Sequence, residues 1–490
     1  MAISFDKIPS NLRTPGVYTE IDSSRAMRGV QLLQYRMLLL GQLTSAGTAD
    51  PLVPVRVTSV KQARDLFGVG SMLAIMVEAA LASNSLSELW CQPIEDAGSG
   101  VDAAGAVTFG GAPTEAGTIS LYIGGKKVQI GATTTDTGAS LATALAAAIN
   151  AATTLPVTAA VDGTITSKVN ITAKNAGEAG NGIDIRVGYY GESLPAGLTT
   201  TVAAMAGGTG NPDITAALAA VGDEWFQVVA MPYTDSANLA LLETELESRF
   251  GPMREIEAHA FAAARGTHGA LGTLGDARNS PHVCIVSAAY EPMPPFAKAA
   301  ETAAIAAYYA SIDPARPLQT LPYAYCLPPA EADRFTQEER NLLLFDGIAT
   351  TNVDAGGVMR IERMVTTYKT NAAGADDTAY LDVETLFTLM TIRHDWRSTI
   401  LAKYPRHKLA SDGTRFAPGQ AVVTPNVIKA EAVAKFREWE EIGLVEGFDQ
   451  FKADLIVERN PSDPNRLDVL LPPDVINQLR LVATKIQFRL

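Results

Sequence analysis

The last twelve residues of the chain, LRLVATKIQFRL (479–490), alternate between apolar and polar side chains. In a strand, Lys485, Gln487 and Arg489 would lie on one face. The opposite face would carry Val482, Thr484, Ile486, Phe488 and Leu490. This period of two residues predicts a β-strand with one buried side.

The segment GVYTEI (16–21) near the start alternates in a similar way, after turn punctuation at Pro15-Gly16. It predicts a second short strand, formed by Val17, Tyr18, Thr19, Glu20 and Ile21. Neither terminal segment has an adjacent strand with which it could form a hairpin. Because chain ends fray unless something ties them down, each predicted strand needs a partner elsewhere, in the same molecule or in another one.

The middle of the chain carries short apolar runs separated by helical stretches. WFQVVAMPY, HAFAAARG and HVCIVSAAY predict strands, and one intervening helix is expected to begin at Asp235 and end at Gly251-Pro252. Residues 30–96 show a similar mixture of strands and helices. Successive strand–helix units predict an α/β fold with a parallel, doubly wound sheet.

The composition changes sharply near Gly98. Between Gly98 and Gly210 lie 20 of the chain's 40 glycines. A hairpin is predicted to turn at Gly124-Gly125, and an alanine-rich helix is expected to follow with Ser140 as its N-cap. This stretch is interpreted as a small α+β insertion entered and left through glycine-rich linkers.

The remainder, from about residue 331, mixes elements. A hairpin is predicted to turn at residues 355–357, and long helices are predicted around residues 379–404 and 426–442. The stretches FKADLIVER and RLDVLL predict further strands. The whole chain is therefore expected to be multidomain, with α/β and α+β parts.

Composition and charge narrow the function. The 490 residues carry a net charge of −14, which disfavours a protein that binds nucleic acid directly. The three cysteines form no CxxC pair, which favours a reducing compartment. The start lacks the uninterrupted apolar core of a signal peptide, and no apolar run approaches 18 residues, so no membrane insertion is expected.

Catalytic motifs are incomplete. DTG at Asp136 and GTHG at His268 resemble two members of a subtilisin-type triad, but no suitable serine motif follows His268. The GVGSML stretch (68–73) lacks the third glycine of a dinucleotide fingerprint. No two of the five histidines have a metal-ligand spacing, so we expect no catalytic residue, no cofactor and no metal. An α/β hydrolase remains the rival interpretation.

Two basic regions are candidates for a protein contact. Between Arg393 and Arg415 there are six Lys or Arg residues and only two acids. The helix 426–442 carries Lys429, Lys435 and Arg437 among glutamates. The first region also fits a solvated helix end and loop, and the helix also fits an exposed face with i,i+4 pairs, so the sequence does not choose between a docking face and these simpler interpretations.

Several long blocks together carry a family resemblance. IPSNLRTPGVYTEIDSSRA, TISLYIGGKKVQI, NPDITAALAAVGDEWFQVVAMPYTD, FGPMREIEAHAFAAARGT, LGDARNSPH and LPPDVINQLRLVATKIQFRL are similar to sheath proteins of contractile-tailed phages of the Mu-like group. The resemblance runs nearly the whole length of the chain.

The resemblance implies a structural subunit rather than an enzyme. Such subunits form stacked hexameric rings around a tail tube and contract to drive the tube through the host cell envelope. The implied partners are further copies of the chain, the tail tube protein, and the baseplate and tail terminator proteins. The implied location is the virion tail, with assembly in the host cytoplasm. A bacteriocin or another contractile injection system is the alternative source.

The resemblance also implies a division of the chain. An N-terminal arm (1–25) and a C-terminal strand arm (478–490) would pair with neighbouring subunits, and the tube would contact Lys429, Lys435 and Arg437 or the basic region. A subtilisin-like core would comprise 26–96 and 211–330. An outward-facing insertion would occupy 97–210, and a C-terminal sheath domain 331–477.

Overall fold

The computed structural model describes residues 14, 16, 17, 19, 30, 33–417 and 419–489. These residues form two compact units. The first, called here the α/β unit, contains Leu33–Met390 together with Asn477–Leu490. The second, called the C-terminal unit, contains Thr391–Ile476. Within the described ranges, no helix combines the length and apolar character needed to cross a bilayer.

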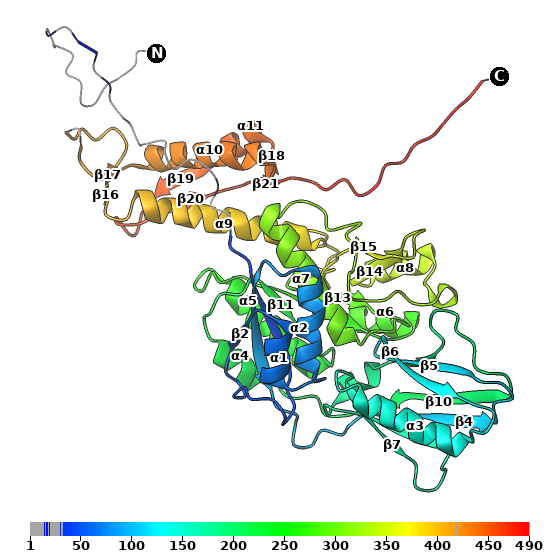
Figure 1. Ribbon diagram of the computed structural model, residues 1–490. Coiled ribbons are helices and arrows are strands. Elements are labelled where there is room, and N and C mark those ends of the chain that lie inside the picture. Colours follow the sequence, from blue (N-terminus) through cyan, green and yellow to red (C-terminus); the bar gives the residue numbers. More distant parts are fainter. Residues whose placement is uncertain are drawn as a thin grey trace. The chain divides into compact units, whose positions relative to one another are not determined.

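The α/β unit is built on an eight-stranded sheet (Figure 1). Its order is β15 (Met359–Arg363), β14 (Ile348–Val353), β13 (Val283–Ser287), β12 (His259–Ala264), β11 (Val228–Ala230), β1 (Arg36–Gln42), β3 (Glu88–Ile94) and β2 (Val55–Val57). The strands from β14 to β3 are parallel, and β15 and β2 run antiparallel at the edges. The predicted parallel sheet is confirmed for its central strands.

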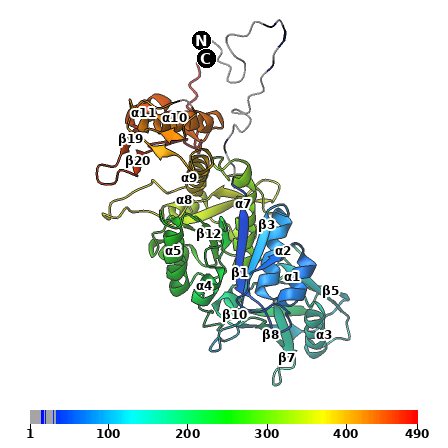
Figure 2. The same ribbon diagram turned by 90° about the vertical axis from the view of Figure 1, so that its left-hand side faces the viewer.

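Helices cover both faces of this sheet. Figure 2 shows α1 (Val60–Phe67) and α2 (Met72–Ser83) on one side of β1 and β3, with α4 (Thr215–Val221) and α5 (Ser236–Phe250) on the other. The unit also contains α6 (His268–Asp276), α7 (Pro295–Ile312), η2 (Glu331–Asp333) and α8 (Gln337–Phe345). As predicted, Asp235 caps α5, accepting a hydrogen bond from Asn238 N, and Gly251 ends it. Alanines let α7 pack closely on α2.

The glycine-rich stretch forms two small sheets with their own apolar core. One has the order β10 (Leu198–Ala206), β4 (Ala104–Gly111), β8 (Lys168–Ala173) and β7 (Val157–Val161). The other has the order β6 (Lys126–Ala132), β5 (Gly117–Ile123) and β9 (Ile185–Val187), and the stretch also contains η1 (Glu178–Gly182). The hairpin between β5 and β6 turns at Gly124 and Gly125, both at positive φ, as the sequence predicted.

The helix of this stretch, α3 (Gly138–Ala151), begins earlier than expected. The assignment of Ser140 as its N-cap is wrong, because Thr137 is the cap. Ser140 N donates to the Thr137 hydroxyl (3.2 Å) while Thr137 N donates to the Ser140 hydroxyl (2.9 Å). This reciprocal pair is a capping box, which places Ser140 at the third helical position.

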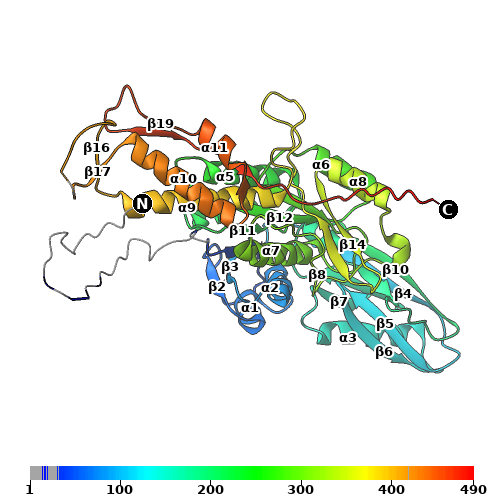
Figure 3. The ribbon, with the colours of Figure 1, turned by 90° about the horizontal axis from the view of Figure 1, so that it is seen from above.

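The C-terminal unit is built around helices. Most of α9 (Val383–Lys403) belongs to it, and Figure 3 shows α10 (Pro425–Glu441) running beside the second half of α9. Trp439 of α10 is fully buried and donates to Asp395 of α9 at 2.7 Å. Three two-stranded sheets complete the unit: β16 (Lys408–Leu409) with β17 (Val422–Val423), β18 (Val445–Glu446) with β21 (Asp474–Val475), and β19 (Ile456–Arg459) with β20 (Leu467–Leu470).

Two boundaries differ from the sequence expectation. The predicted strand FKADLIVER is half helix, because α11 (Phe448–Asp454) precedes β19 and stacks Phe451 on Phe436 with ring centroids 4.1 Å apart. The main sheet also continues past residue 330, where the core was expected to end. It does so because β14 pairs with β13 and carries β15 with it.

Candidate functional site

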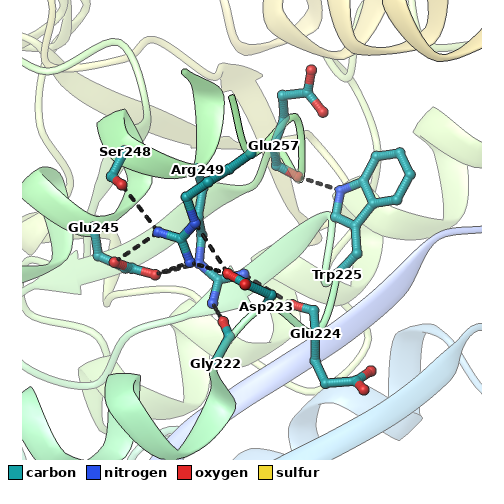
Figure 4. Close-up of polar contacts among 9 residues, drawn as sticks. Gly222, Asp223, Glu224, Trp225, Glu245, Ser248, Arg249 and Glu257 are labelled. Carbon is teal, nitrogen blue, oxygen red and sulfur yellow. Dashed lines mark hydrogen bonds and ion pairs between the residues drawn. The ribbon is translucent and has the colours of Figure 1, made fainter. Parts of the chain in front are cut away.

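Dense clusters of charge in the α/β unit hold the fold together. Figure 4 shows Arg249 of α5, whose almost fully buried side chain reaches Gly222, the C-cap of α4. Its guanidinium donates to the carbonyl oxygens of Gly222 and Glu224 (2.9 Å for the latter) and to the Glu245 carboxylate (2.8 Å). Arg254 adds an ion pair to Glu245 at 3.0 Å. These contacts satisfy carbonyls that the helix end leaves open, which is a structural role.

The two residues of the incomplete triad are each engaged locally. Asp136 accepts hydrogen bonds from Thr133 and Ser140, and the Thr133 backbone bond chiefly lowers its pKa. The His268 ring nitrogen Nε2 lies 3.0 Å from the Glu339 carbonyl oxygen. Asp136 is part of the turn before α3, whereas His268 is the first residue of α6. The structure therefore gives each residue a separate local role.

The remaining reactive side chains lie in the core. Cys91, Cys284 and Cys326 are buried as free thiols, and burial raises their pKa well above the ordinary value. Burial lowers the pKa of His259 to about 3, so this imidazole is neutral at physiological pH. In the parts of the chain that the structure describes, no group of three His, Cys, Asp or Glu residues could hold a metal ion.

The sequence did not reveal two buried charges on α7. The Lys298 ammonium donates to the Ser287 carbonyl oxygen at 2.6 Å and pairs with Glu291, and both charged side chains are almost completely buried. Glu301, also buried, accepts backbone hydrogen bonds from Ala324, Tyr325 and Cys326. The apolar pattern of PFAKAAETAAIAAYYASI hides them, because alanines surround both residues.

Only part of the predicted N-terminal strand can be placed. Val17 is 97% exposed and Thr19 is exposed as well. Tyr18, Glu20 and Ile21 lie outside the described residues. The pairing of this strand stays a prediction.

The C-terminal segment leaves the α/β unit without forming a strand there (Figure 1). All nine residues from 481 to 489 are exposed, and none of them belongs to a strand or helix of the described chain. The predicted apolar face includes Val482, Ile486 and Phe488, which are 73%, 85% and 79% exposed. Thr484 is exposed too, and Leu490 lies outside the described residues.

The root of this segment is held by Arg480. Its guanidinium lies 3.1 Å from the Asp382 carboxylate and 3.0 Å from the Glu384 carboxylate. Burial raises the pKa of Glu384, and Arg480 opposes that rise. The terminal segment therefore has an anchored beginning and an exposed remainder.

The predicted tube-contact residues have different surroundings. Lys435 is 3% exposed and pairs with Asp395 and Glu438 at 2.7 Å, so the expectation that it faces a partner needs correction. The sequence placed Lys435 on an exposed face of the helix. In the structure it lies between α10 and α9, where Asp395 of α9 and Glu438 of α10 pair with its charge. Lys429 is half-buried, and Arg437 is exposed beside Glu440.

The basic segment is more accessible than the helix. Arg406, Lys408 and Arg415 are all exposed; Lys408 begins β16, and the two arginines lie on the loops on either side of this strand. Arg393 and Arg397 precede them on α9. Three exposed cations of this unit therefore lie in the segment that follows α9.

The hairpin of β19 and β20 offers sheet edges. The two strands pair antiparallel from Ile456 with Leu470 to Arg459 with Leu467, and β19 lies against α10. Neither strand has a second neighbour among the residues that the structure describes. Ile456 and Leu470 are 50% and 56% exposed. A two-stranded sheet is marginal by itself, so an added strand would stabilise it.

The chain is similar in sequence to known tail sheath proteins. Residues 207–367 match the phage tail sheath protein central domain, and residues 375–489 match the phage tail sheath C-terminal domain. The chain is 42% identical over 489 residues to the Mu-like prophage FluMu tail sheath protein of Haemophilus influenzae, which covers 100% of both chains. These matches define a structural protein of contractile tails rather than an enzyme. The chain belongs to the phage tail sheath family, and the predicted resemblance is confirmed.

Solved structures of sheath proteins are similar at low identity. The sheath tail protein of Desulfitobacterium hafniense is 15% identical, with a TM-score of 0.48 and coverage of 94% of this chain and 100% of that one. The Listeria innocua sheath tail protein is 14% identical, with a TM-score of 0.49 and coverage of 93% and 95%. The contracted helical sheath of the anti-feeding prophage is 12% identical, with a TM-score of 0.48 and coverage of 97% and 99%.

Proposed function

We propose that this chain polymerises as stacked hexameric rings around a tail tube and contracts to drive the tube through a host envelope. Its family membership supports a contractile tail sheath protein of a phage or a contractile injection system. Because sheath proteins are part of the virion tail, the tail is the site of action, and assembly would take place in the host cytoplasm. Tail tube, baseplate and terminator proteins are the proposed partners.

The observation that carries this proposal is the fully exposed, alternating C-terminal segment. A chain that exposes Val482, Ile486 and Phe488 together on one face of a potential strand leaves large apolar side chains in water. Strand addition to another copy would bury that face and satisfy the backbone groups. Residues 478–490 would then be one intersubunit arm, and residues 1–25 the other.

The β19–β20 hairpin is the proposed acceptor. Its edges lack further strands within the described chain, and its half-exposed Ile456 and Leu470 could pack against an incoming apolar face. A head-to-tail contact of this kind does not close on itself between two copies, so it can propagate into rings and helical stacks.

The remaining regions of the chain have proposed roles as well. The eight-stranded sheet would be the subtilisin-like core, and the glycine-rich stretch 97–210 would face outward from the tube. Contraction would exchange one packing of subunits for another, with the extended packing metastable. The energy would be stored during assembly. The same polymerisation and contraction would serve in a bacteriocin or another contractile injection system.

The arm is tested by substitutions on one face at a time. The triple variant Val482→Ser, Ile486→Ser and Phe488→Ser should lose sheath polymers in negative-stain microscopy, because it removes the face that would be buried. The matched control is Lys485→Ser, Gln487→Ser and Arg489→Ser, which changes the opposite face and should still polymerise. Normal polymers from both variants would contradict the arm.

The tube contact is proposed for the basic segment rather than for α10. Lys435 is committed to Asp395, whereas Arg406 and Lys408 are exposed. The variant Arg406→Glu/Lys408→Glu should reduce co-sedimentation with tail tubes at least tenfold, because it would repel an acidic tube surface. The control Lys452→Glu reverses an exposed cation of the same unit that lies outside the β19–β20 hairpin and should bind normally.

A further inference from the structure

One arginine fixes the point at which the C-terminal segment leaves the α/β unit. Arg480 places Nη2 at 3.1 Å from Asp382 Oδ1 and 3.0 Å from Glu384 Oε2, and Nη1 donates to Gln319 Oε1 at 3.3 Å. The same guanidinium also donates to the Gln478 side chain. We call these five residues the Arg480 clamp. The Arg480 side chain is only 15% exposed.

The partners in the Arg480 clamp are themselves held in place. The Arg363 guanidinium grips both carboxylate oxygens of Asp382, with both distances at 2.9 Å. Glu384 is 1% exposed and accepts a hydrogen bond from Leu318 N at 2.8 Å. Gln478 donates to the Ala315 carbonyl oxygen at 3.3 Å. The clamp therefore rests on β15, on the start of α9 and on the segment after α7.

The chain on either side of the clamp is attached differently. Beyond it, residues 481–489 are all exposed. Before it, Ile476 N donates to the Leu444 carbonyl oxygen at 3.0 Å, a contact that belongs to the C-terminal unit. With the clamp closed, ten residues follow the last anchor, and they span at most about 36 Å.

We propose that Arg480 is the positioning residue of the C-terminal arm, because it makes the α/β unit the carrier of residues 481–490 and sets where they start toward a second copy of this chain. This inference rests on the proposed role of the arm. A short tether from a fixed root raises the effective concentration of the arm at its acceptor. A fixed root also leaves less entropy to lose when the strand pairs.

The clamp itself is tested by limited trypsin digestion of the full chain kept below its assembly concentration. Trypsin must take the arginine side chain into its own pocket, so cleavage after Arg480 should be at least tenfold slower than cleavage after Lys485. The variants Asp382→Asn and Gln319→Ala/Gln478→Ala should each speed cleavage after Arg480 relative to cleavage after Lys485. Equal cleavage after Arg480 and Lys485 in the wild-type protein would overturn the clamp.

The positioning role is tested by the lowest protein concentration at which polymers sediment. Arg480→Gln should raise that threshold at least tenfold, and Arg480→Lys should give a threshold between those of Arg480→Gln and wild type. The matched control Arg489→Gln should leave the threshold unchanged. Should Arg480→Gln lower the melting temperature, a four-residue Gly-Ser insertion after Arg480 replaces it. That insertion keeps the clamp but moves the arm, so it should also raise the threshold.

Deletion of residues 481–490 separates the two proposals. If the deletion abolishes polymers while Arg480→Gln and the insertion assemble like wild type, the positioning role is wrong and the arm stands. If the deletion polymerises normally, the arm is wrong and the positioning role falls with it. If the deletion loses polymers and either Arg480→Gln or the insertion raises the threshold, the result supports both the arm and the positioning role of Arg480.

Discussion

Strand β13 and the segment 481–489 are both rich in β-branched and apolar residues, but they differ in where their partners are. All five residues of β13 are buried, and the strand pairs with β12 and β14. All nine residues of the terminal segment are exposed, and they pair with no strand of the described chain. Because β13 has strand partners on both sides and is buried along its whole length, its sequence shows no alternation.

The terminal segment alternates because only one of its faces would be buried. A continuous apolar run thus marks a strand inside the sheet, while the alternating run of the terminal segment fits the proposed strand that pairs with another copy. The comparison predicts that substitutions in the β13 region change folding, whereas substitutions in the terminal segment change assembly. The following experiments test that difference, beginning with the largest expected effect.

The buried pair next to β13 should give the largest loss of stability. Lys298→Met leaves the Glu291 carboxylate buried without its cation, so the free energy of unfolding should fall by about 3–5 kcal/mol. Urea denaturation of the unassembled protein measures this. The double variant Lys298→Met/Glu291→Leu removes both charges and should regain most of the loss. A double variant as unstable as the single one would show that the unpaired Glu291 carboxylate does not cause the loss of stability.

A cavity in β13 comes next. Ile285 is completely buried, so Ile285→Ala should cost about 2–5 kcal/mol of unfolding free energy through lost apolar burial and the cavity left behind. The midpoint of urea unfolding measures the loss. A loss below about 1 kcal/mol would mean that neighbouring side chains collapse into the space.

These two sites also mark the limit of what the sequence predicted. The parallel strands were predictable because β11, β12 and β13 are short apolar runs spaced by helices. Lys298 was not, because a lone lysine among alanines on α7 is usually expected to reach solvent, and its partner Glu291 lies outside the helix. Lys435 was misjudged for a similar reason, since its partner Asp395 is 40 residues away on α9.

For the terminal segment, the alternation of Val482, Ile486 and Phe488 predicts a strand, which the described chain does not form by itself, so the strand stays a prediction. The contacts of Arg480 at the start of the segment were not predicted. Nothing local in LPPDVINQLRL marks Arg480 as an ion-pair residue, because its charged partners Asp382 and Glu384 lie about 100 residues earlier, at the start of α9. Long-range ion pairs of this kind need the fold before they can be found.

Breaking the Arg480 clamp should lower stability by an intermediate amount that depends on pH. Glu384 is buried with a raised pKa, and the nearby cations are Arg480 and Arg363, with Asp382 as the neighbouring anion. Arg480→Gln removes the main opposing charge, so the pKa of Glu384 should rise further.

Proton binding by Glu384 sets the direction in which stability changes with pH. Between the unfolded pKa and the raised folded pKa, the folded state holds more protons, so stability falls as pH rises through that window. The deficit of Arg480→Gln relative to wild type should therefore be largest near pH 8 and shrink toward pH 5, by about 1.4 kcal/mol for each unit of additional pKa rise. Thermal melts across this range measure it. A pH-independent deficit, or one that persists unchanged in Arg480→Gln/Glu384→Gln, would contradict the assignment.

The smallest expected effect on folding comes from the matched isoleucine of the terminal segment. Ile486 is 85% exposed, so Ile486→Ala should change the unfolding free energy of the unassembled protein by no more than about 0.5 kcal/mol, in contrast to Ile285→Ala. The same variant should raise the polymerisation threshold, because the side chain would be buried only between copies. Sedimentation at a series of concentrations measures the threshold. If Ile486→Ala unfolds the isolated chain as Ile285→Ala does, the terminal strand has its partner inside its own subunit.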